Sequence, residues 1–450
     1  MNPPDALDST LPTAAPPPGV SLAEALRFWL KLGFISFGGP AGQIALMHTE
    51  LVERRRWVSE RRFLHALNFC MLLPGPEAQQ LATYLGWLMH RTLGGVLAGV
   101  LFVLPSLFLI GGLAWIYLRF GHLPVIAGLF YGIKPAVVAI VLHAAHRVGS
   151  RALRNPMLWA IALAAFAAVA VAQAPFPMVV AGAALVGLIG GRLRPAQFAF
   201  AGHAARAAAL VDDDAAPLPH TRFQVSHTVK VALVGVALWA GPMALLVALT
   251  GWHSAYSQMA WFFTKAALMT FGGAYAVLPY VYQGAVEHYG WITPSQMIDG
   301  LALGETTPGP LIMIVAFVGF IGGYVDGLFG PEARALAGAL GAALATWFTF
   351  LPSFLFILLG GPLVESTHGD LKFTAPLTAI TAAVVGVMLN LALFFAGHVL
   401  WPAGLAAAPD WPALMLSVGA LWALLRWKLS VVRVIAASAA LGLGWYCLFR

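Results

Sequence analysis

The sequence predicts an all-α polytopic membrane protein built from two homologous halves. Of its 450 residues, 60% are hydrophobic and only 10% are charged, and the mean hydropathy is +0.82. A soluble domain is nearer a quarter charged. The apolar runs are long and contain Gly, Ala and Pro, without the alternation of polar and apolar residues that β-barrel strands show. A motif pattern that recurs in the second half of the chain predicts the duplication.

Composition and motifs narrow the function. The net charge is +7, but the arginines stand between apolar runs, where positive-inside placement explains them better than nucleic-acid binding. Cys70 and Cys447 both lie in apolar segments, which predicts neither a disulfide framework nor a metal site, and no cofactor is expected. The chain has no nucleophile elbow, HExxH motif or phosphate-binding GxxxxGKS/T motif. The sequence therefore predicts a non-enzyme that uses an ion gradient instead of ATP.

The chain divides into a tail, two repeats and a connection between them. Residues 1–20 are rich in Pro and small residues and are predicted to form a disordered tail, without a cleaved signal peptide. The N-terminal repeat covers 21–191, a polar linker 192–227, a linking transmembrane helix 228–250 and the C-terminal repeat 251–450. About 13 hydrophobic helices are expected, at residues 22–47, 63–89, 93–118, 123–145, 156–172, 176–191, 228–250, 256–282, 297–324, 333–359, 373–400, 412–427 and 429–449.

Two apolar segments of each half contain a predicted helix break. In the first half these are Phe37-Gly38-Gly39-Pro40 and Leu73-Pro74-Gly75-Pro76. Adding 234 to these numbers gives FGG at 271–273 and PGP at 308–310 without a gap. After an insertion of 13 residues (247 − 234), LPS at 104–106 matches LPS at 351–353. Because broken backbone at membrane depth is tolerated only where it is buried in protein or lines a cavity, the breaks are predicted to lie at the centre.

The distribution of arginine predicts opposite orientations for the two halves. The loop 50–62 carries five arginines, whereas its partner, 284–296, carries neither Lys nor Arg. Cytoplasmic loops attract Lys and Arg, so the repeat is predicted to be inverted about an axis in the membrane plane. The other basic clusters become cytoplasmic if the FGG and PGP segments are re-entrant, which places the N-terminus inside and the C-terminus outside. Tilted spans with simple proline kinks are the alternative.

Candidate anion ligands surround the breaks. Lys31 and Lys265 lie six residues before Phe37 and Phe271, and either would attract an anion, although Lys31 could instead snorkel to the interface. Helices that begin after the glycines would point free N–H groups back toward the break, whereas close helix packing is the alternative role for the glycines. The predicted substrate-binding residues are Lys31, Gly38, Gly39, Pro74, Gly75, Pro76, Lys265, Gly272, Gly273, Pro308, Gly309 and Pro310.

Two carboxylates are predicted to couple transport to protons. Glu77 follows the first PGP, and Glu305 precedes the second by three residues. They are not equivalent in the repeat, since Glu77 maps to Leu311. A buried carboxylate can take up a proton, while a role in the first turn of a helix is the alternative for Glu77. Lys134, also inside an apolar segment, is either a structural cation or a ligand.

Eight short motifs follow one another in a fixed order. They are FGGP at 37–40, WVS at 57–59, LPGP at 73–76, LPS at 104–106, FGGAYAVLP at 271–279, GWIT at 290–293, TPGP at 307–310 and LPS at 351–353. Together they resemble the chromate ion transporter family in its long-chain, two-domain form, over most of residues 25–400. Ala274 departs from the pattern, because many members have another Gly there.

The resemblance implies a secondary transporter of the bacterial inner membrane that exports chromate with the proton-motive force and confers chromate resistance. Chromate and sulfate are both tetrahedral dianions, so transport of sulfate or another oxyanion is one alternative. An anion channel lined by the same residues is another. The expected partners are a chromate-like or sulfate-like oxyanion and the lipid bilayer, with no nucleic acid, and a homodimer stays open.

Overall fold

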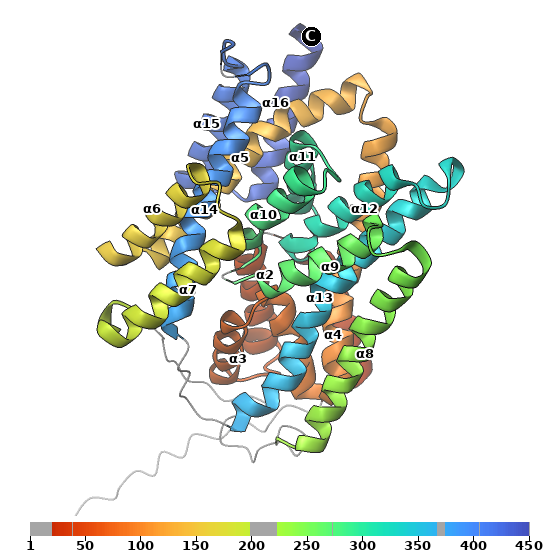
Figure 1. Cartoon of the computed structure of the whole chain (residues 1–450), viewed down its shortest axis with the longest axis vertical. Coiled ribbons are helices and arrows are strands. Elements are labelled where there is room, and N and C mark those ends of the chain that lie inside the picture. The colour runs from red at the N-terminus through yellow and green to blue at the C-terminus, as the bar shows by residue number, and fades with distance from the viewer. Residues whose placement is uncertain are drawn as a thin grey trace, which may run out of the picture.

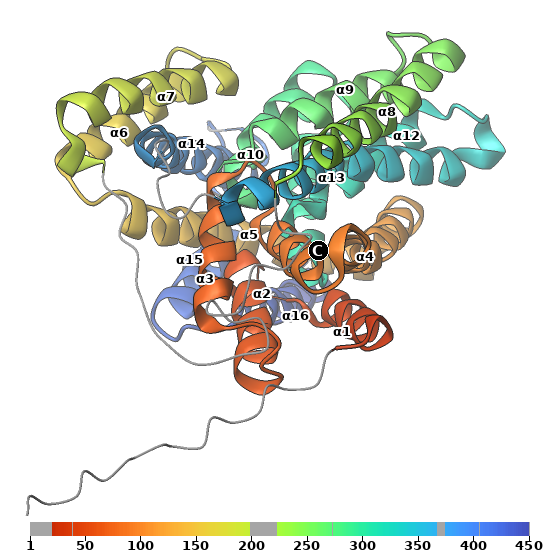
Figure 2. The same ribbon diagram turned by 90° about the horizontal axis from the view of Figure 1, so that it is seen from below.

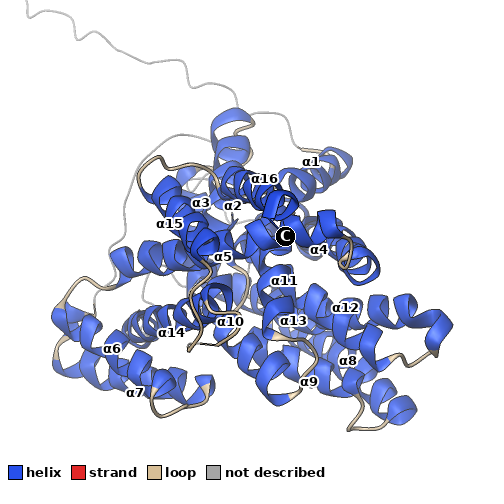
Figure 3. Cartoon of the chain, turned by 90° about the horizontal axis from the view of Figure 1, so that it is seen from above, coloured by secondary structure: helices blue, strands red, loops and turns tan. Residues whose placement is uncertain are grey.

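The computed structural model describes residues 20–37, 39–198, 223–271, 273–366, 374–404 and 406–449. Two predicted site residues, Gly38 and Gly272, lie outside the described residues, as do the predicted tail up to residue 19 and most of the predicted linker, 199–222. The described residues contain sixteen α-helices and no strand, as Figure 3 shows. The all-α prediction is therefore confirmed.

The helices of the first half end before the undescribed stretch at 199–222. They are α1 (Leu22–Ile35), α2 (Gly39–His48), α3 (Glu60–Leu72), α4 (Glu77–Phe120), α5 (Pro124–Ala152), α6 (Pro156–Ala170) and α7 (Phe176–Leu193). A π-helical turn, Thr49–Arg54, follows α2, and a 3-10 turn, Pro195–Gln197, follows α7. The next helix, α8 (Val225–Thr250), corresponds to the predicted linking helix.

The second half repeats the alternation of short and long helices. Its helices are α9 (Ala255–Leu268), α10 (Ala274–Tyr282), α11 (Pro294–Thr306), α12 (Ile314–Asp326), α13 (Arg334–Ser366), α14 (Thr374–Leu400), α15 (Trp411–Leu425) and α16 (Val431–Phe449). A π-helical turn, Gln283–His288, follows α10, and 3-10 turns occur at Leu311–Met313 and Pro331–Ala333.

Several helices are long and apolar enough to cross a membrane. Among the described residues there are seven such helices: α4, α5, α7, α8, α13, α14 and α16. Shorter apolar helices, α6, α12 and α15, accompany them. A multi-span membrane protein is thereby confirmed, whereas the count of 13 hydrophobic helices and the inverted relation of the halves stay predictions.

The helices are interrupted at the FGG and PGP motifs. α1 ends at Ile35 and α2 begins at Gly39, α3 and α4 are separated at residues 73–76, α9 ends at Leu268 and α10 begins at Ala274, and α11 is followed by TPGP at 307–310. Gly75 has φ = 130° and Gly309 has φ = 106°, a backbone conformation that side chains with a Cβ rarely adopt. The prolines on either side lack an N–H donor, so a helix cannot continue through these turns.

The segments on either side of TPGP form an antiparallel helical hairpin. Gly300 of α11 packs against Phe317 of α12, so the chain folds back at 307–310. A second reversal lies inside α4, where His90 and Arg91 have non-helical backbone angles. Across that reversal Gly86 packs against Gly94. The chain therefore reverses between the predicted segments 63–89 and 93–118, and α4 consists of two helices that meet at residues 90–91.

Helices α10 and α13 lie in the middle of the molecule. Figures 1 and 2 show α6 and α7 on one side and α8 on the other, with α4, α10 and α13 between them. Burial agrees with this arrangement, since 61% of the apolar window of α13 is buried but only 17% of that of α8. α8 is therefore peripheral. The backbone of the breaks is interior, since Ser36, Gly75, Thr270 and Gly309 are buried.

Candidate functional site

The centre of the site is a reciprocal pair of backbone hydrogen bonds between the halves. The Gly75 N–H donates to the Thr270 carbonyl oxygen at 2.7 Å, and the Gly309 N–H donates to the Ser36 carbonyl oxygen at 2.9 Å. Adding 234 to Ser36 and Gly75 gives Thr270 and Gly309. Each PGP turn is thus bound to the residue that precedes the FGG motif of the other half, and the four breaks form two equivalent pairs.

The same reciprocity extends to the side chains around each turn. A Cβ built on Gly75 would lie 2.3 Å from Ser353 Oγ, and one built on Gly309 would lie 2.6 Å from Ser106 Cβ. These serines belong to the two LPS motifs and are equivalent in the repeat (106 + 247 = 353). Each PGP turn therefore packs tightly on the LPS serine of the other half, and only glycine leaves room for it.

The helices that start at the breaks differ in capping from the helices that lead into them. The side chains of Ser59, Ser254 and Thr293 cap α3, α9 and α11. The N-cap residues of α4 and α10 are Pro76 and Gly273, and neither helix has a side-chain cap among the described residues. Because the first N–H groups of a helix lack intrahelical partners, these two open ends can accept an anion. The N–H groups of the PGP glycines cannot, since they are bound to the other half.

Both predicted carboxylates lie beside α10. Glu77 Oε1 is 3.8 Å from the position that a Cβ on Gly273 would take, so it lies near the N-termini of α4 and α10. Glu305 is 5% exposed and accepts a hydrogen bond from the Tyr275 hydroxyl of α10. The structure therefore brings the two carboxylates to one short helix, although the repeat does not relate them.

One cation near the carboxylates was missed by sequence reasoning. Arg147 of α5 interacts electrostatically with both Glu77 and Glu305. In the sequence it is one of three arginines that follow the apolar segment 123–145, and such a cluster predicts a cytoplasmic loop. Nothing in its spacing signals proximity to the breaks, because the approach of α5 to them depends on tertiary packing.

The two predicted lysines lie on the outer faces of their helices. Lys31 is exposed on α1 beside the exposed Leu30 and Phe34. The Lys265 ammonium lies over the Trp261 ring, 5.7 Å from its centroid, and the residue is half-buried. These lysines therefore influence an anion at the breaks through their positive charge, and not through direct contact with the PGP turns.

Two glutamines hold the backbone of the breaks and were not predicted as ligands. Gln43 Nε2 donates to the Gly309 oxygen at 2.5 Å and to the Ser36 oxygen at 3.2 Å. Gln80 Nε2 donates to the Pro74 oxygen at 2.8 Å. Both side chains are fully buried. Their amide groups satisfy carbonyls that the broken helices leave without intrahelical partners.

A second polar cluster joins the halves away from the turns. Asp299 of α11 is 2% exposed, accepts a hydrogen bond from the Tyr117 hydroxyl at 2.9 Å and lies 3.5 Å from Lys134 Nζ. Lys134 also donates to Ser295 Oγ at 2.6 Å. Lys134 is therefore a structural cation in this arrangement. Asp299 was missed because a single acidic residue near a helix start is normally solvated.

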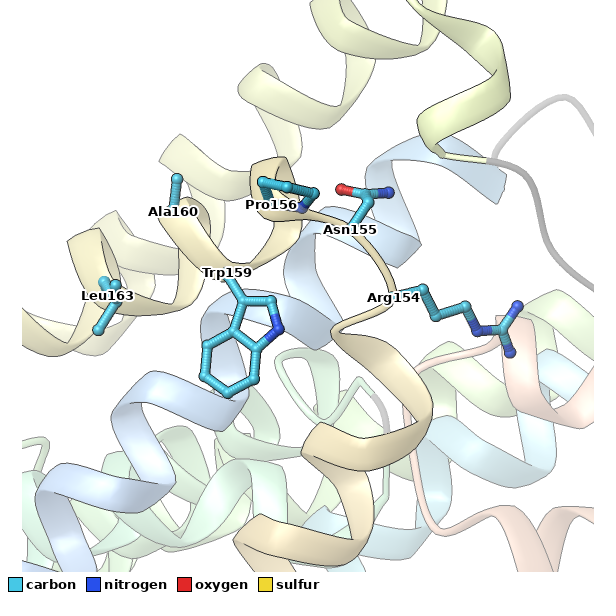
Figure 4. A pocket seen from close by; sticks show the side chains of 6 residues that line it. All are labelled: Arg154, Asn155, Pro156, Trp159, Ala160 and Leu163. Atoms are coloured by element: carbon cyan, nitrogen blue, oxygen red, sulfur yellow. The ribbon is translucent and has the colours of Figure 1, made fainter.

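One surface cleft lies away from this site. It has a volume of about 540 Å³ and is lined by Arg154, Asn155, Pro156, Trp159, Ala160 and Leu163 at the connection of α5 to α6. Figure 4 shows the Arg154 side chain pointing away from the apolar side chains of α6. Trp159 and Leu163 are exposed, as expected for a face of a membrane helix that meets lipid. The cleft is not a candidate for a polar substrate.

Broken helices that meet inside a helical membrane protein are the arrangement in which secondary transporters bind their substrates. The fold and the interlocked breaks therefore define a membrane transport protein. A family model described as "Chromate transporter" matches residues 23–188 and 257–443. The chain belongs to this family.

Similar proteins carry the same description. The chain is 34% identical over 388 residues to "Chromate transport protein" of Pseudomonas aeruginosa, covering 86% of this chain and 83% of that protein. It is 30% identical over 454 residues to "Chromate transport protein" of Cupriavidus metallidurans, covering all of both chains. A "Probable chromate transport protein" of Synechococcus elongatus is 28% identical over 431 residues, or 94% of this chain and 95% of that protein. No solved structure matches the chain.

Proposed function

We propose that this protein is a secondary active transporter that exports chromate across the bacterial inner membrane, driven by the proton-motive force, and so confers chromate resistance. The observation that carries the proposal is the reciprocal binding of each PGP turn to the FGG break of the other half. It creates one central place where two repeats meet, and rocking of one repeat against the other could expose that place to either side in turn.

The proposed substrate site consists of the residues of the four breaks. The open N-termini of α4 and α10 supply backbone N–H groups and the positive ends of two helix dipoles. Lys31 and Lys265 supply positive potential that attracts a dianion toward this region. Glu77 and Glu305 are the proposed proton-carrying groups, because both lie beside α10.

Charge favours export of such a substrate. Moving one elementary charge across 100 mV is worth about 2.3 kcal/mol, so an inside-negative potential favours expulsion of a dianion by roughly 4.6 kcal/mol. An ionised Glu77 would compete with the substrate for the helix N-termini. Protonation of Glu77 removes that competition, so anion and proton would bind together. The complex would carry one net negative charge outward, which the same potential favours by about 2.3 kcal/mol. In this scheme the membrane-potential component of the proton-motive force drives export.

Uptake of labelled chromate into inverted membrane vesicles tests the proposal. We expect uptake that depends on the membrane potential and on pH, is saturable, and is inhibited more strongly by unlabelled chromate than by sulfate. Vesicles from cells without the protein are the control. Equal uptake in both vesicle types would reject the proposal. Stronger inhibition by sulfate would indicate that sulfate, and not chromate, is the substrate. Sustained current without proton dependence in bilayers would indicate a channel.

A further inference from the structure

Two buried serine hydroxyls at the interlocked turns have no hydrogen-bond partner among the described residues. They are Ser106 Oγ in α4 and Ser353 Oγ in α13, and the two residues are 1% and 0% exposed. Most buried hydroxyls in proteins are hydrogen-bonded, because an unpaired one loses its bonds to water. That two equivalent residues of a repeat share this condition needs a specific reason.

Packing alone does not supply the reason. Ser353 Oγ lies against Gly75 and the Ser106 side chain lies against Gly309, so both positions require a small residue. Alanine is as small and would bury no polar atom. Serine at both places is therefore explained better by a partner that is present only part of the time, such as a bound substrate.

A hydroxyl has the chemistry that an oxyanion needs. It can donate a hydrogen bond to an anionic oxygen, and bonds to charged groups are the stronger ones. The neighbouring glutamines are unsuitable, because Gln43 and Gln80 already donate to backbone carbonyls. Gln43 uses both of its N–H groups in this way, and the Oε1 atoms of both glutamines can only accept and would repel a dianion.

We propose that Ser106 and Ser353 bind the transported oxyanion, one hydroxyl from each half. The proposal rests on the transport function proposed above and assigns two ligands to the same site. The substrate class that suits this arrangement is a tetrahedral oxyanion, because its several acceptor oxygens would let it accept a hydrogen bond from each hydroxyl. Movement of one half against the other would then break one of these bonds and weaken binding.

The test is the Michaelis constant for chromate in inverted vesicles that contain Ser106→Ala, Ser353→Ala or both. We expect each single substitution to raise KM by about tenfold, as the loss of one hydrogen bond to a charged group predicts. The double substitution should raise it further. Ser417→Ala is the matched control, since Ser417 is also buried without a hydrogen-bond partner among the described residues but lies in α15, and its KM should not change.

Thermal unfolding of the purified variants separates binding from folding. Because an unpaired hydroxyl cannot stabilise the fold, the alanine variants should unfold at the wild-type temperature or above it. Chromate should raise the unfolding temperature of the wild type more than that of the variants. An unchanged KM, or a lower unfolding temperature in either variant, would overturn the assignment. A wild-type protein that transports no chromate would instead overturn the proposed function.

Discussion

At the scale of single residues, Gly75 and Gly309 carry the most demanding geometry. Both have positive φ and face a serine of the other half too closely for a Cβ. We expect Gly309→Ala to destabilise the protein by roughly 2–4 kcal/mol, from the left-handed backbone and the overpacking together. Thermal unfolding in detergent measures this. Gly112→Ala is the control, because Gly112 lies in α4 with no atom within 4 Å of a Cβ, and it should be neutral or slightly stabilising.

The ionised carboxylate of Glu77 would compete with an anionic substrate for the helix N-termini. An ionised carboxylate near the N-termini of α4 and α10 repels a dianion, so wild-type transport should fall as the pH rises and this carboxyl loses its proton. Glu77→Gln carries no charge at any pH, so its transport should stay nearly constant over the same range. Initial rates of chromate uptake between pH 5 and 8 measure the difference. Glu332→Gln, in an exposed turn before α13, should keep the wild-type profile, and a Glu77→Gln profile as steep as the wild type would refute the role.

The breaks could be predicted from single residues, but their partners could not. Pro and Gly change the local backbone wherever they stand, so residues 73–76 signal a turn without tertiary information. The contact of Gly75 with Thr270 joins positions almost 200 residues apart, and no local pattern encodes it. The roles of Ser106, Gln80 and Asp299 were missed for the same reason, because the sequence around a polar residue does not show which residues it contacts in the fold.

At the scale of helices, the cluster around Asp299 fastens α11 of one half to α4 and α5 of the other. Asp299→Ala leaves Lys134 without its carboxylate in a partly buried place, and we expect a loss of about 2–3 kcal/mol, below the range for a fully buried pair because Lys134 is partly exposed. Asp326→Ala, at the exposed end of α12, should have little effect. Thermal unfolding measures both.

A double substitution separates the ion pair from the other contacts of Asp299. Replacing Lys134 by Met in the Asp299→Ala background removes the unpaired charge, so part of the lost stability should return. If the double variant is as unstable as the sum of the two single variants, then the Tyr117 hydrogen bond and packing, not the ion pair, account for the effect of Asp299→Ala.

Helix boundaries could be predicted where a local residue, such as an N-cap, determines them. They were harder to predict where packing between two helices determines them. The start of α3 follows from Ser59, whose side chain caps it, and capping residues are visible in sequence. The reversal at His90 and Arg91 has no Pro or Gly at the turn itself. It is marked instead by Gly86 and Gly94, which let the two helices approach closely after the chain has turned.

At the scale of the whole molecule, the N–H group of each PGP glycine is hydrogen-bonded to the other half. The Gly75 N–H finds its acceptor in the second half and the Gly309 N–H finds its acceptor in the first. An exchange of equivalent contacts of this kind requires approximate two-fold symmetry between the repeats. The contacts do not depend on how that axis lies relative to the membrane, whereas the arginine distribution predicts that it lies in the membrane plane.

Equivalent positions of the two halves can test that orientation. Arg91 is exposed at the reversal in α4. If the offset of the PGP motifs is continued, the corresponding position is Val325 (91 + 234), which is 65% exposed at the end of α12. Single cysteines at these two positions can be placed in a Cys447→Ala background, because Cys447 is exposed while Cys70 is buried. An inverted repeat predicts that a membrane-impermeant maleimide labels position 325 but not position 91 in intact cells.

Inverted vesicles should give the opposite result, with label at position 91 and none at 325. The Cys447→Ala background without a new cysteine should stay unlabelled, and permeabilised cells should show label at both positions. Label at both positions from one side would mean that the repeats are parallel. Label at position 91 from outside would reject a re-entrant PGP segment, because a segment that crosses the membrane once would carry residue 91 to the outer surface.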